Sequence, residues 1–203
     1  MPNVITAGNS SNGGTAITTD TSGTLNIVTG SGSGVTAMSI DASGNVSGVL
    51  KSGTAVTNAS GTSIDFTGIP STAKRITVMF SDVSLSGTAN PMIRLGTASG
   101  IESGTIYYAM SGANTTSNAA SAQNFTTGFG IQSGLATNSV IGQLVITNIS
   151  GNTWIAMGTF TGNTSNNTWI TGKVTLTGVL TQLRCTNNGS DTFDAGTINI
   201  LYE

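Results

Sequence analysis

The chain has 203 residues, enough for one ordinary domain with an extension, and its six basic and eight acidic residues give a net charge of -2. Charged residues make up 7% of the chain, against roughly 25% in a typical soluble domain, and so few basic residues disfavour nucleic-acid binding. Histidine is absent and the single cysteine is Cys185, which excludes Ser-His-Asp and Cys-His catalysis, zinc sites and internal disulfides.

The rest of the composition predicts an all-β protein. Gly, Ser, Thr and Asn make up about half of the chain, while Lys, Glu and Pro are scarce, so strand and turn formers dominate over helix formers. No apolar run is long enough to span a bilayer, and no signal peptide is recognisable. We therefore expect a protein that is made and kept in a cytoplasm, without a membrane partner.

Residues 1–62 are expected to form an extended N-terminal β arm. No aromatic residue precedes Phe66, and the large aliphatic residues are too few to offset the entropy lost on ordering this much backbone. The arm should therefore either stay mobile or lie against a partner.

An internal repeat favours an arm that lies against a partner over a mobile one. Residues Ala16 to Val28 align with Ala37 to Val49 at an offset of 21 residues, on either side of the flexible connector Gly30 to Gly34. Each copy predicts a strand, an Asp-x-Ser-Gly turn and a second strand, and a disordered linker is the alternative. The apolar residues of the arm that we expect to contact other chains are Leu25, Ile27, Val28, Met38, Ile40, Val46 and Val49.

Residues 63–203 predict a head domain of about eight to ten short antiparallel strands, which indicates a jelly-roll-like β-sandwich. Apolar residues alternate at Ile76, Val78 and Phe80, and the parity then changes at Asp82, as a bulge or corner would produce. The further strand candidates are Met92 to Leu95, Thr105 to Met110, Phe125 to Ile131, Val140 to Ile149, Thr153 to Thr161, Thr168 to Leu176, Leu180 to Thr186 and Thr197 to Tyr202, and the expected loops include Ser111 to Ser121 and Gly162 to Asn167.

The two tryptophans stand in a repeated phrase, because Asn152 to Ile155 and Asn167 to Ile170 both read Asn-Thr-Trp-Ile. The repeat predicts two neighbouring strands of one hairpin. Aromatic rings in this region either fill the core, which is the simpler use, or lie exposed and stack on sugar rings. The candidates for glycan stacking are Trp154, Trp169, Tyr107 and Tyr108.

No constellation of residues predicts an enzyme. Asp191 and Asp194 could be read as the paired acids of a glycosidase, but an Asn- and Ser-rich loop is also where Asp serves as a turn residue. Glu102 and Glu203 have no obvious partner, and no Asp-x-Asp-x-Asp run indicates calcium. We therefore expect no catalytic residue, no metal and no cofactor.

The outward-facing strand positions predict a symmetric oligomer. Nearly every such position carries Thr, Ser or Asn rather than Lys or Glu. Soluble monomers usually protect exposed strand edges with charge, whereas a neutral, hydroxyl-rich surface packs against copies of itself without burying ions.

Four segments of the chain resemble virion proteins of tailed bacteriophages, including those of cyanobacterial and marine phages. They are the opening Met1 to Ser10, the phrase at Gly23 to Val28, the approach to the first strong strand at Ile69 to Val78, and the ending Ala195 to Ile200. Two kinds of virion protein share this style, namely capsid-decorating (cement) proteins and distal domains of tail fibres or tailspikes. Both kinds of protein are commonly homotrimeric and β-rich, so the resemblance implies a virion surface protein assembled in the host cytoplasm.

A short arm and a sandwich head fit a cement protein better than a fibre, because the arm leaves little room for both a virion anchor and a shaft. The resemblance then implies a homotrimer on the outer capsid surface that clamps neighbouring subunits of the major capsid protein. The alternative is a receptor-binding tip of a tail fibre or tailspike that recognises a host surface glycan. A small polysaccharide-degrading enzyme is the least favoured interpretation.

Overall fold

The structure is a computed structural model that describes residues 23–29, 35–47, 49–57, 59–114, 120–133, 136–162 and 167–203. The chain divides into two compact units, Met1–Leu50 and Lys51–Glu203. Every named element of the described residues is a β-strand, and every pairing between named strands is antiparallel. The described residues include no helix that could cross a bilayer. The prediction of an all-β fold is confirmed.

The first unit contains a small three-stranded sheet. Its strands β1 (Leu25–Thr29), β2 (Val35–Ile40) and β3 (Val46–Ser47) lie in sequence order. Between β2 and β3, the Asp41 carboxylate accepts hydrogen bonds from the backbone N–H groups of Ser43 and Asn45, both at 2.9 Å. Gly44 adopts a φ of 83°, which a glycine accepts without strain. The strand, turn and second strand predicted for the second repeat copy are therefore present, whereas residues 16–22 of the first copy lie outside the described residues.

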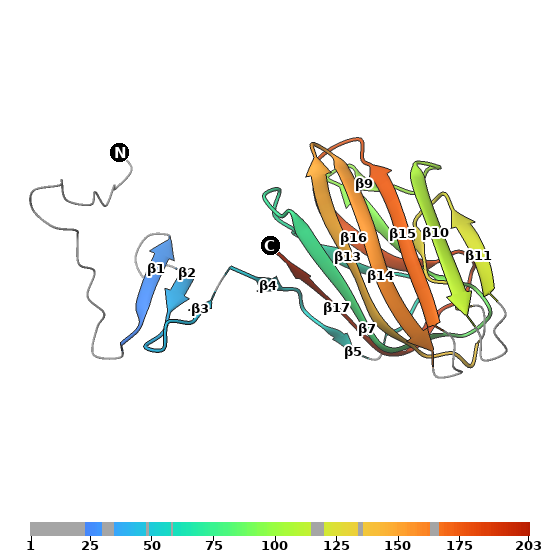
Figure 1. Cartoon of the computed structure of the whole chain (residues 1–203), viewed down its shortest axis with the longest axis horizontal. Helices are drawn as coiled ribbons and strands as arrows, with labels where there is room; N and C mark the ends of the chain where they lie inside the picture. The colour runs from blue at the N-terminus through green and yellow to red at the C-terminus, as the bar shows by residue number, and fades with distance from the viewer. Residues whose placement is uncertain are drawn as a thin grey trace, which may run out of the picture. The chain divides into compact units, whose positions relative to one another are not determined.

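The second unit is built around a nine-stranded sheet. Figure 1 shows its strands side by side, from β11 and β10 at one end to β17 and β4 at the other. Along the sheet, in spatial order, they are β11 (Ala120–Phe125), β10 (Tyr107–Asn114), β15 (Asn167–Thr175), β14 (Thr153–Gly162), β13 (Val140–Ser150), β7 (Arg75–Leu85), β17 (Phe193–Tyr202) and β4 (Lys51–Ser52), with β5 (Val56–Thr57) also pairing with β17.

A five-stranded sheet forms the second layer of the sandwich. Its strand order is β12 (Phe129–Gly130), β8 (Pro91–Thr97), β16 (Leu180–Asn187) and β6 (Ile64–Thr67), and β9 (Gly100–Ile101) pairs with β8. Arg184 and Asp65 lie directly opposite each other on β16 and β6, where Arg184 donates two hydrogen bonds of 2.6 and 2.7 Å to the carboxylate. These hydrogen bonds raise the pKa of Arg184.

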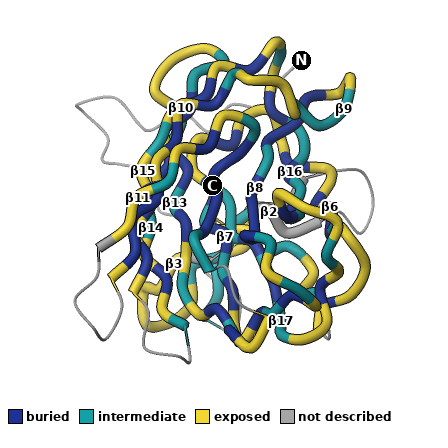
Figure 2. Tube along the Cα trace, turned by 90° about the vertical axis from the view of Figure 1, so that its right-hand side faces the viewer, coloured by how far each residue is buried: buried dark blue, intermediate teal, exposed yellow. Residues whose placement is uncertain are grey.

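One hydrophobic core lies between the two sheets. Along long strands such as β7, β14 and β15, buried residues alternate with more exposed ones (Figure 2), because successive side chains of a strand point to opposite faces of its sheet. Strand β8 differs, since every residue in it except Arg94 is buried. The nine-stranded sheet contributes residues such as Ile76, Val78 and Leu144, and the five-stranded sheet contributes residues such as Leu95 and Leu183. The expected β-sandwich head is therefore present.

The predicted change of parity at Asp82 is a β-bulge. Asp82 has a φ of 54°, in the left-handed region, and the register of β7 shifts here against both β13 and β17. On β17 the opposing residue is Gly196, whose φ is 91°. A side chain at Gly196 would overlap the carbonyl of Asp82, so the two strands approach this closely only because the residue is glycine.

The division between the units falls after Leu50 rather than after Thr62. Residues 51–62, which we expected to belong to the arm, instead supply strands β4 and β5 to the nine-stranded sheet. Val56 also packs against the core. These short, polar segments have little alternation of their own, and only their pairing with β17 makes them part of the head.

Two strand boundaries around β10 and β11 differ from the expected ones. The predicted loop Ser111 to Ser121 is partly strand, since β10 continues to Asn114 and β11 begins at Ala120. Conversely, the predicted strand Phe125 to Ile131 is interrupted by a turn at residues 126–128, where the chain leaves one sheet and joins the other. Small residues at the end of β10 weaken the sequence pattern there, while apolar residues on both sides of the turn imitate a continuous strand.

Candidate binding surfaces

The small sheet has one apolar face. Leu25 lies opposite Ile40, Ile27 opposite Met38, and Ile40 opposite Val46. Residues that face each other across antiparallel strands project from the same side of the sheet, so these five side chains share a face. The other face carries Asn26 and Ser39.

Nothing within the described part of the first unit covers this apolar face. Ile27 and Val46 are exposed, Leu25, Met38 and Ile40 are half-buried, and no described side chain of residues 23–50 is buried. Of the other two expected contact residues, Val49 is exposed, and the side chain of Val28 lies outside the described residues. The structure thus brings five of the seven expected contact residues together on one surface.

The repeated tryptophan phrase forms the predicted hairpin, because β14 and β15 pair along their length. The two tryptophans project from opposite faces of this hairpin. Trp154 lies in the core with 4% of its surface exposed, whereas Trp169 is 41% exposed. Trp154 is therefore excluded as a residue that stacks on a glycan, and Trp169 is retained.

The two tyrosines of β10 divide in the same way. Tyr107 lies in the core, where its ring meets Phe129 edge-on at a centroid distance of 5.2 Å. Its hydroxyl accepts a 2.8 Å hydrogen bond from the N–H of Leu95 and donates to the carbonyl of Glu102, and burial raises its pKa. Tyr108 points the other way and is 74% exposed. Tyr107 is therefore corrected to a core residue, and Tyr108 remains a candidate.

Tyr108 and Trp169 belong to the outer face, by which we mean the side of β10, β15, β14 and β13 that is turned away from the core. The pairing of these strands places Tyr108, Lys173 and Ile155 in one row, and Met110, Thr171 and Met157 in the next. The large apolar side chains exposed on the outer face are Tyr108, Met110, Ile141, Ile155, Met157 and Trp169. Soluble monomers rarely expose so many large apolar residues together.

The ring of Trp169 lies on Gly112, its neighbour across β15 and β10. A Cβ atom at residue 112 would overlap the six-membered ring of the indole. Glycine at this position therefore lets the indole lie close to the backbone of β10.

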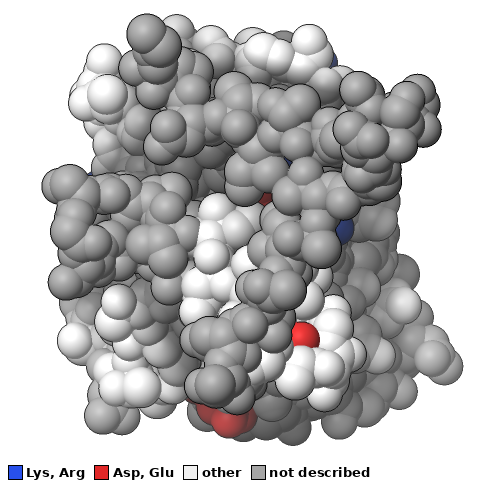
Figure 3. Space-filling view, turned by 90° about the vertical axis from the view of Figure 1, so that its left-hand side faces the viewer, with Lys and Arg blue, Asp and Glu red and all other residues white. Residues whose placement is uncertain are grey.

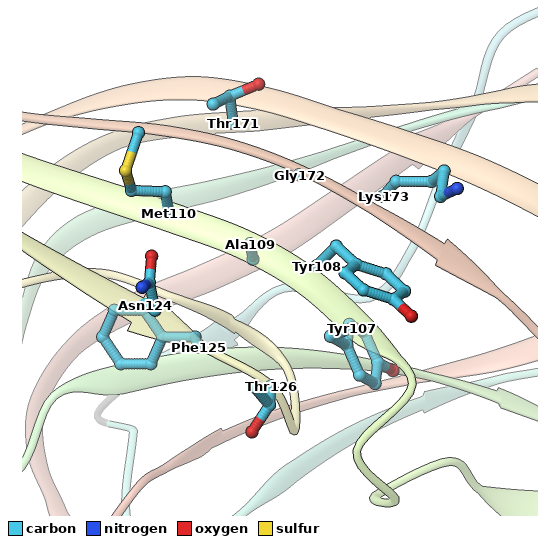
Figure 4. A pocket seen from close by; sticks show the side chains of 10 residues that line it. All are labelled: Tyr107, Tyr108, Ala109, Met110, Asn124, Phe125, Thr126, Thr171, Gly172 and Lys173. Carbon is cyan, nitrogen blue, oxygen red and sulfur yellow. The ribbon is translucent and has the colours of Figure 1, made fainter.

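Two hollows open on the outer face. The first, of about 600 Å³, lies over β10 between β15 and β11. In Figure 4, Tyr108 and Lys173 lie at one end of it, with Met110 and Asn124 towards the other. The second, of about 500 Å³, is lined by residues that include Trp169, Thr159 and Ile141.

The outer face is nearly free of charge. Lys173 is the one charged residue in the described sequences of β11, β10, β15, β14 and β13. Its Nζ atom lies 5.5 Å from the centre of the Tyr108 ring, in a cation–π contact. Figure 3 draws a different side of the molecule, where the described residues also show few charged atoms.

The acids that we considered for catalysis each have a structural contact. Asp191 accepts a 2.7 Å hydrogen bond from the N–H of Ala89, and Asp194 accepts one from the hydroxyl of Ser84. Glu102 accepts hydrogen bonds from Thr177, and Glu203 forms an ion pair with Arg75. Within the described ranges, no three His, Cys, Asp or Glu residues gather as metal ligands would.

Comparison with known proteins adds no relative, since no family model, curated protein or solved structure matches this chain. The binding surfaces therefore rest on the geometry alone.

Sequence reasoning missed Lys173, Met110 and Met157 as members of the outer face. Their alternation with buried neighbours carries the signal, because Met110 and Lys173 stand at even spacing from Tyr108 and Trp169 along their own strands.

Proposed function

We propose that this protein is a non-enzymatic structural component of a bacteriophage virion, namely a capsid cement protein. In this proposal it forms a homotrimer on the outer capsid surface, and its first unit clamps neighbouring subunits of the major capsid protein. The source of the phage assignment is the resemblance of the four sequence segments described above. The structure contributes the surface that would make the contact.

The single observation that carries the proposal is the uncovered apolar face of the small sheet. Leu25, Ile27, Met38, Ile40 and Val46 share this face, and no described residue of the first unit is buried. A sheet of this size without a core gains little stability by itself. It would gain stability by burying the face against another polypeptide, and the symmetric arrangement of a capsid offers the same contact many times.

A fibre tip remains the second candidate, because Tyr108 and Trp169 lie exposed beside two hollows of the outer face. Exposed aromatic rings of this kind suit receptor binding. The location on the particle distinguishes the two candidates. Antibody labelling over the shell supports the cement protein, and labelling at the tail supports the fibre tip.

Adjacent residues of β1 provide a matched test of the clamp. Ile27→Thr changes the apolar face, whereas Asn26→Thr changes the polar face, and Thr is compatible with a strand in both positions. We expect Ile27→Thr to weaken binding of the full-length protein to particles that lack it by about tenfold, which corresponds to about 1.4 kcal/mol. Asn26→Thr should bind as the unmodified protein does.

Co-sedimentation of labelled protein with particles measures this difference, and native mass spectrometry reports whether the trimer persists. A second apolar-face variant, Val46→Thr, provides an independent repeat. If both apolar-face variants bind particles like Asn26→Thr, the small sheet is not the clamp.

A further inference from the structure

We propose that the hollow beside Tyr108 and Lys173 binds an acidic oligosaccharide, with a sugar ring against Tyr108 and a carboxylate beside Lys173. This inference goes beyond the proposed function, since neither a capsid clamp nor a trimer requires a saccharide. It applies equally to a protein on the shell and to one on the tail.

The first argument is the presentation of Tyr108. Its side chain is 74% exposed near the start of β10, where the neighbouring residues Tyr107 and Ala109 are buried. Tyr108 pairs with Lys173 of β15, and the N–H of Tyr107 donates a 3.1 Å hydrogen bond to the carbonyl of Thr126, so the backbone beneath the ring is held from both sides. A flat ring held on a rigid sheet offers an apolar surface to the C–H groups of a sugar at a small entropy cost.

The second argument is charge. Lys173 lies on the strand next to Tyr108, directly opposite it. Neither of the ion pairs formed by the described residues involves Lys173, and the described residues of the five strands around the hollow contain no Asp or Glu. An unpaired ammonium group in neutral surroundings favours an anion, and its contact with Tyr108 holds the two groups together.

The third argument is the chemistry of the other lining residues. Asn124, Thr126 and Thr171 place amide and hydroxyl groups around the hollow, and such groups pair with the hydroxyls of a sugar. The hollow has a volume of about 600 Å³, within the range of about 300–1,000 Å³ that is usual for ligand sites. Aromatic, cationic and neutral polar groups thus lie within one site.

Charge also disfavours self-association of two chains through their outer faces as the use of this hollow. Two outer faces packed together would bring Lys173 towards a surface whose described strands have no carboxylate to pair with it. Burial of an unpaired ammonium group is costly. An acidic saccharide supplies the missing negative charge.

The second hollow extends the site along β15. Trp169 lies four residues from Lys173 on this strand, or about 13 Å at the usual rise of a strand. Beyond it, Thr159, Thr161 and Asn167 line a hollow of about 500 Å³. An oligosaccharide that follows β15 from Lys173 would therefore meet a second exposed ring and a second group of neutral hydrogen-bonding side chains.

Isothermal titration of the full-length protein with tetragalacturonate tests the site, and maltotetraose serves as the neutral probe. We expect the acidic probe to bind, and to bind more weakly as the salt concentration rises. Lys173→Gln should weaken binding of the acidic probe by about tenfold, and Tyr108→Ala by a similar factor. Lys51→Gln is the matched control, because it removes an exposed lysine at the opposite end of the same sheet.

Both substituted side chains are exposed, and the conservative Lys173→Gln tests the site even if Tyr108→Ala proves unstable. If tetragalacturonate does not bind, or if it binds equally to the protein and to both variants, the proposal is overturned. The proposal is also overturned if the protein binds no saccharide and Tyr108→Ala converts an oligomer to a monomer. In that case a second copy of the chain, and not a saccharide, occupies the hollow. Ile27→Thr separates the two proposals, because it should lose particle binding and keep saccharide binding.

Discussion

At the scale of single residues, the contact between Gly196 and Asp82 combines an unusual backbone conformation with a close approach of two strands. Both residues have left-handed φ angles, and a side chain at residue 196 would overlap the backbone of Asp82. Gly61 provides a comparison, since its φ of 78° is equally unusual for other residues but nothing lies within 4 Å of a Cβ built there. The two glycines therefore separate the cost of backbone strain from the cost of overlap.

We predict that Gly196→Ala lowers the free energy of unfolding by about 3 kcal/mol, because it combines strain with overlap. Gly61→Ala should cost about 1 kcal/mol from strain alone. Urea unfolding followed by tryptophan fluorescence measures both values. Equal losses in the two variants would show that β7 and β17 can separate at the bulge without cost.

Cys185 provides a second prediction at this scale. The residue is completely buried in β16, and burial raises the pKa of its thiol. Since the thiolate is the reactive form, the folded protein at pH 8 should not react with an aromatic disulfide reagent, whereas the protein in urea should react fully. Above the ordinary thiol pKa of 9.0 the unfolded chain loses the thiol proton while the folded chain keeps it. The fold is therefore more stable below pH 9.0 and loses stability as the pH rises above this value. Rapid reaction in the absence of urea would contradict the described core.

At the scale of elements, the sequence predicts the strands that alternate and the hairpin that repeats a phrase. It predicts the bulge at Asp82 as well, because the apolar parity changes there. It does not predict the end of β10, where Ser111 is buried and its hydroxyl accepts a hydrogen bond from Gln132. A buried polar residue with a distant partner looks like a loop residue until the tertiary contact is known.

The faces of the hairpin make a direct prediction, because the same Asn-Thr-Trp-Ile phrase occurs on both strands. Trp154→Ala should lower the free energy of unfolding by about 3–5 kcal/mol, as expected for a large core residue. Trp169→Ala should lower it by less than about 1.5 kcal/mol, since its ring is half-exposed. Urea unfolding followed by circular dichroism measures both. Similar losses would mean that the two rings have similar environments.

The turn between β2 and β3 predicts a pH dependence. Hydrogen bonds to Asp41, of which the largest contribution comes from the Asn45 side chain, lower its pKa below the ordinary value of 3.8. A lowered pKa stabilises the turn above this value, and the stabilisation is lost as the pH falls through the pKa of the folded state. Carboxyl NMR titration of Asp41 should therefore give a midpoint below 3.8, and Asn45→Ala should move the midpoint upward. An unchanged midpoint would place the Asn45 amide away from the carboxylate.

At the scale of the whole molecule, the two units differ in what holds them. The buried hydrophobic residues, from Ala59 to Ile200, all belong to the second unit among the described residues. The shortage of apolar residues before Phe66 predicts this difference. The candidate site on the outer face was only half predictable, because composition singles out Tyr108 and Trp169, but the pairing of β10 with β15 is needed to place Lys173 beside Tyr108.

The boundary between the units gives the last prediction. A fragment of residues 51–203 keeps β4 and β5 on the edge of β17, whereas a fragment of residues 63–203 leaves this edge bare. The loss also uncovers the side of the core near Ile200, against which Gly53 packs. An uncovered strand edge favours association with other chains.

We therefore expect the fragment 51–203 to unfold at the same urea concentration as the full chain, since both tryptophans and the described core lie within it. The fragment 63–203 should unfold at a lower concentration and aggregate at rest, as measured by fluorescence and light scattering. Equal stability of the two fragments would show that residues 51–62 do not stabilise the head and belong to the arm. A fragment 51–203 that is markedly less stable than the full chain would show that the first unit supports the head, in which case the small sheet does more than present its apolar face to a partner.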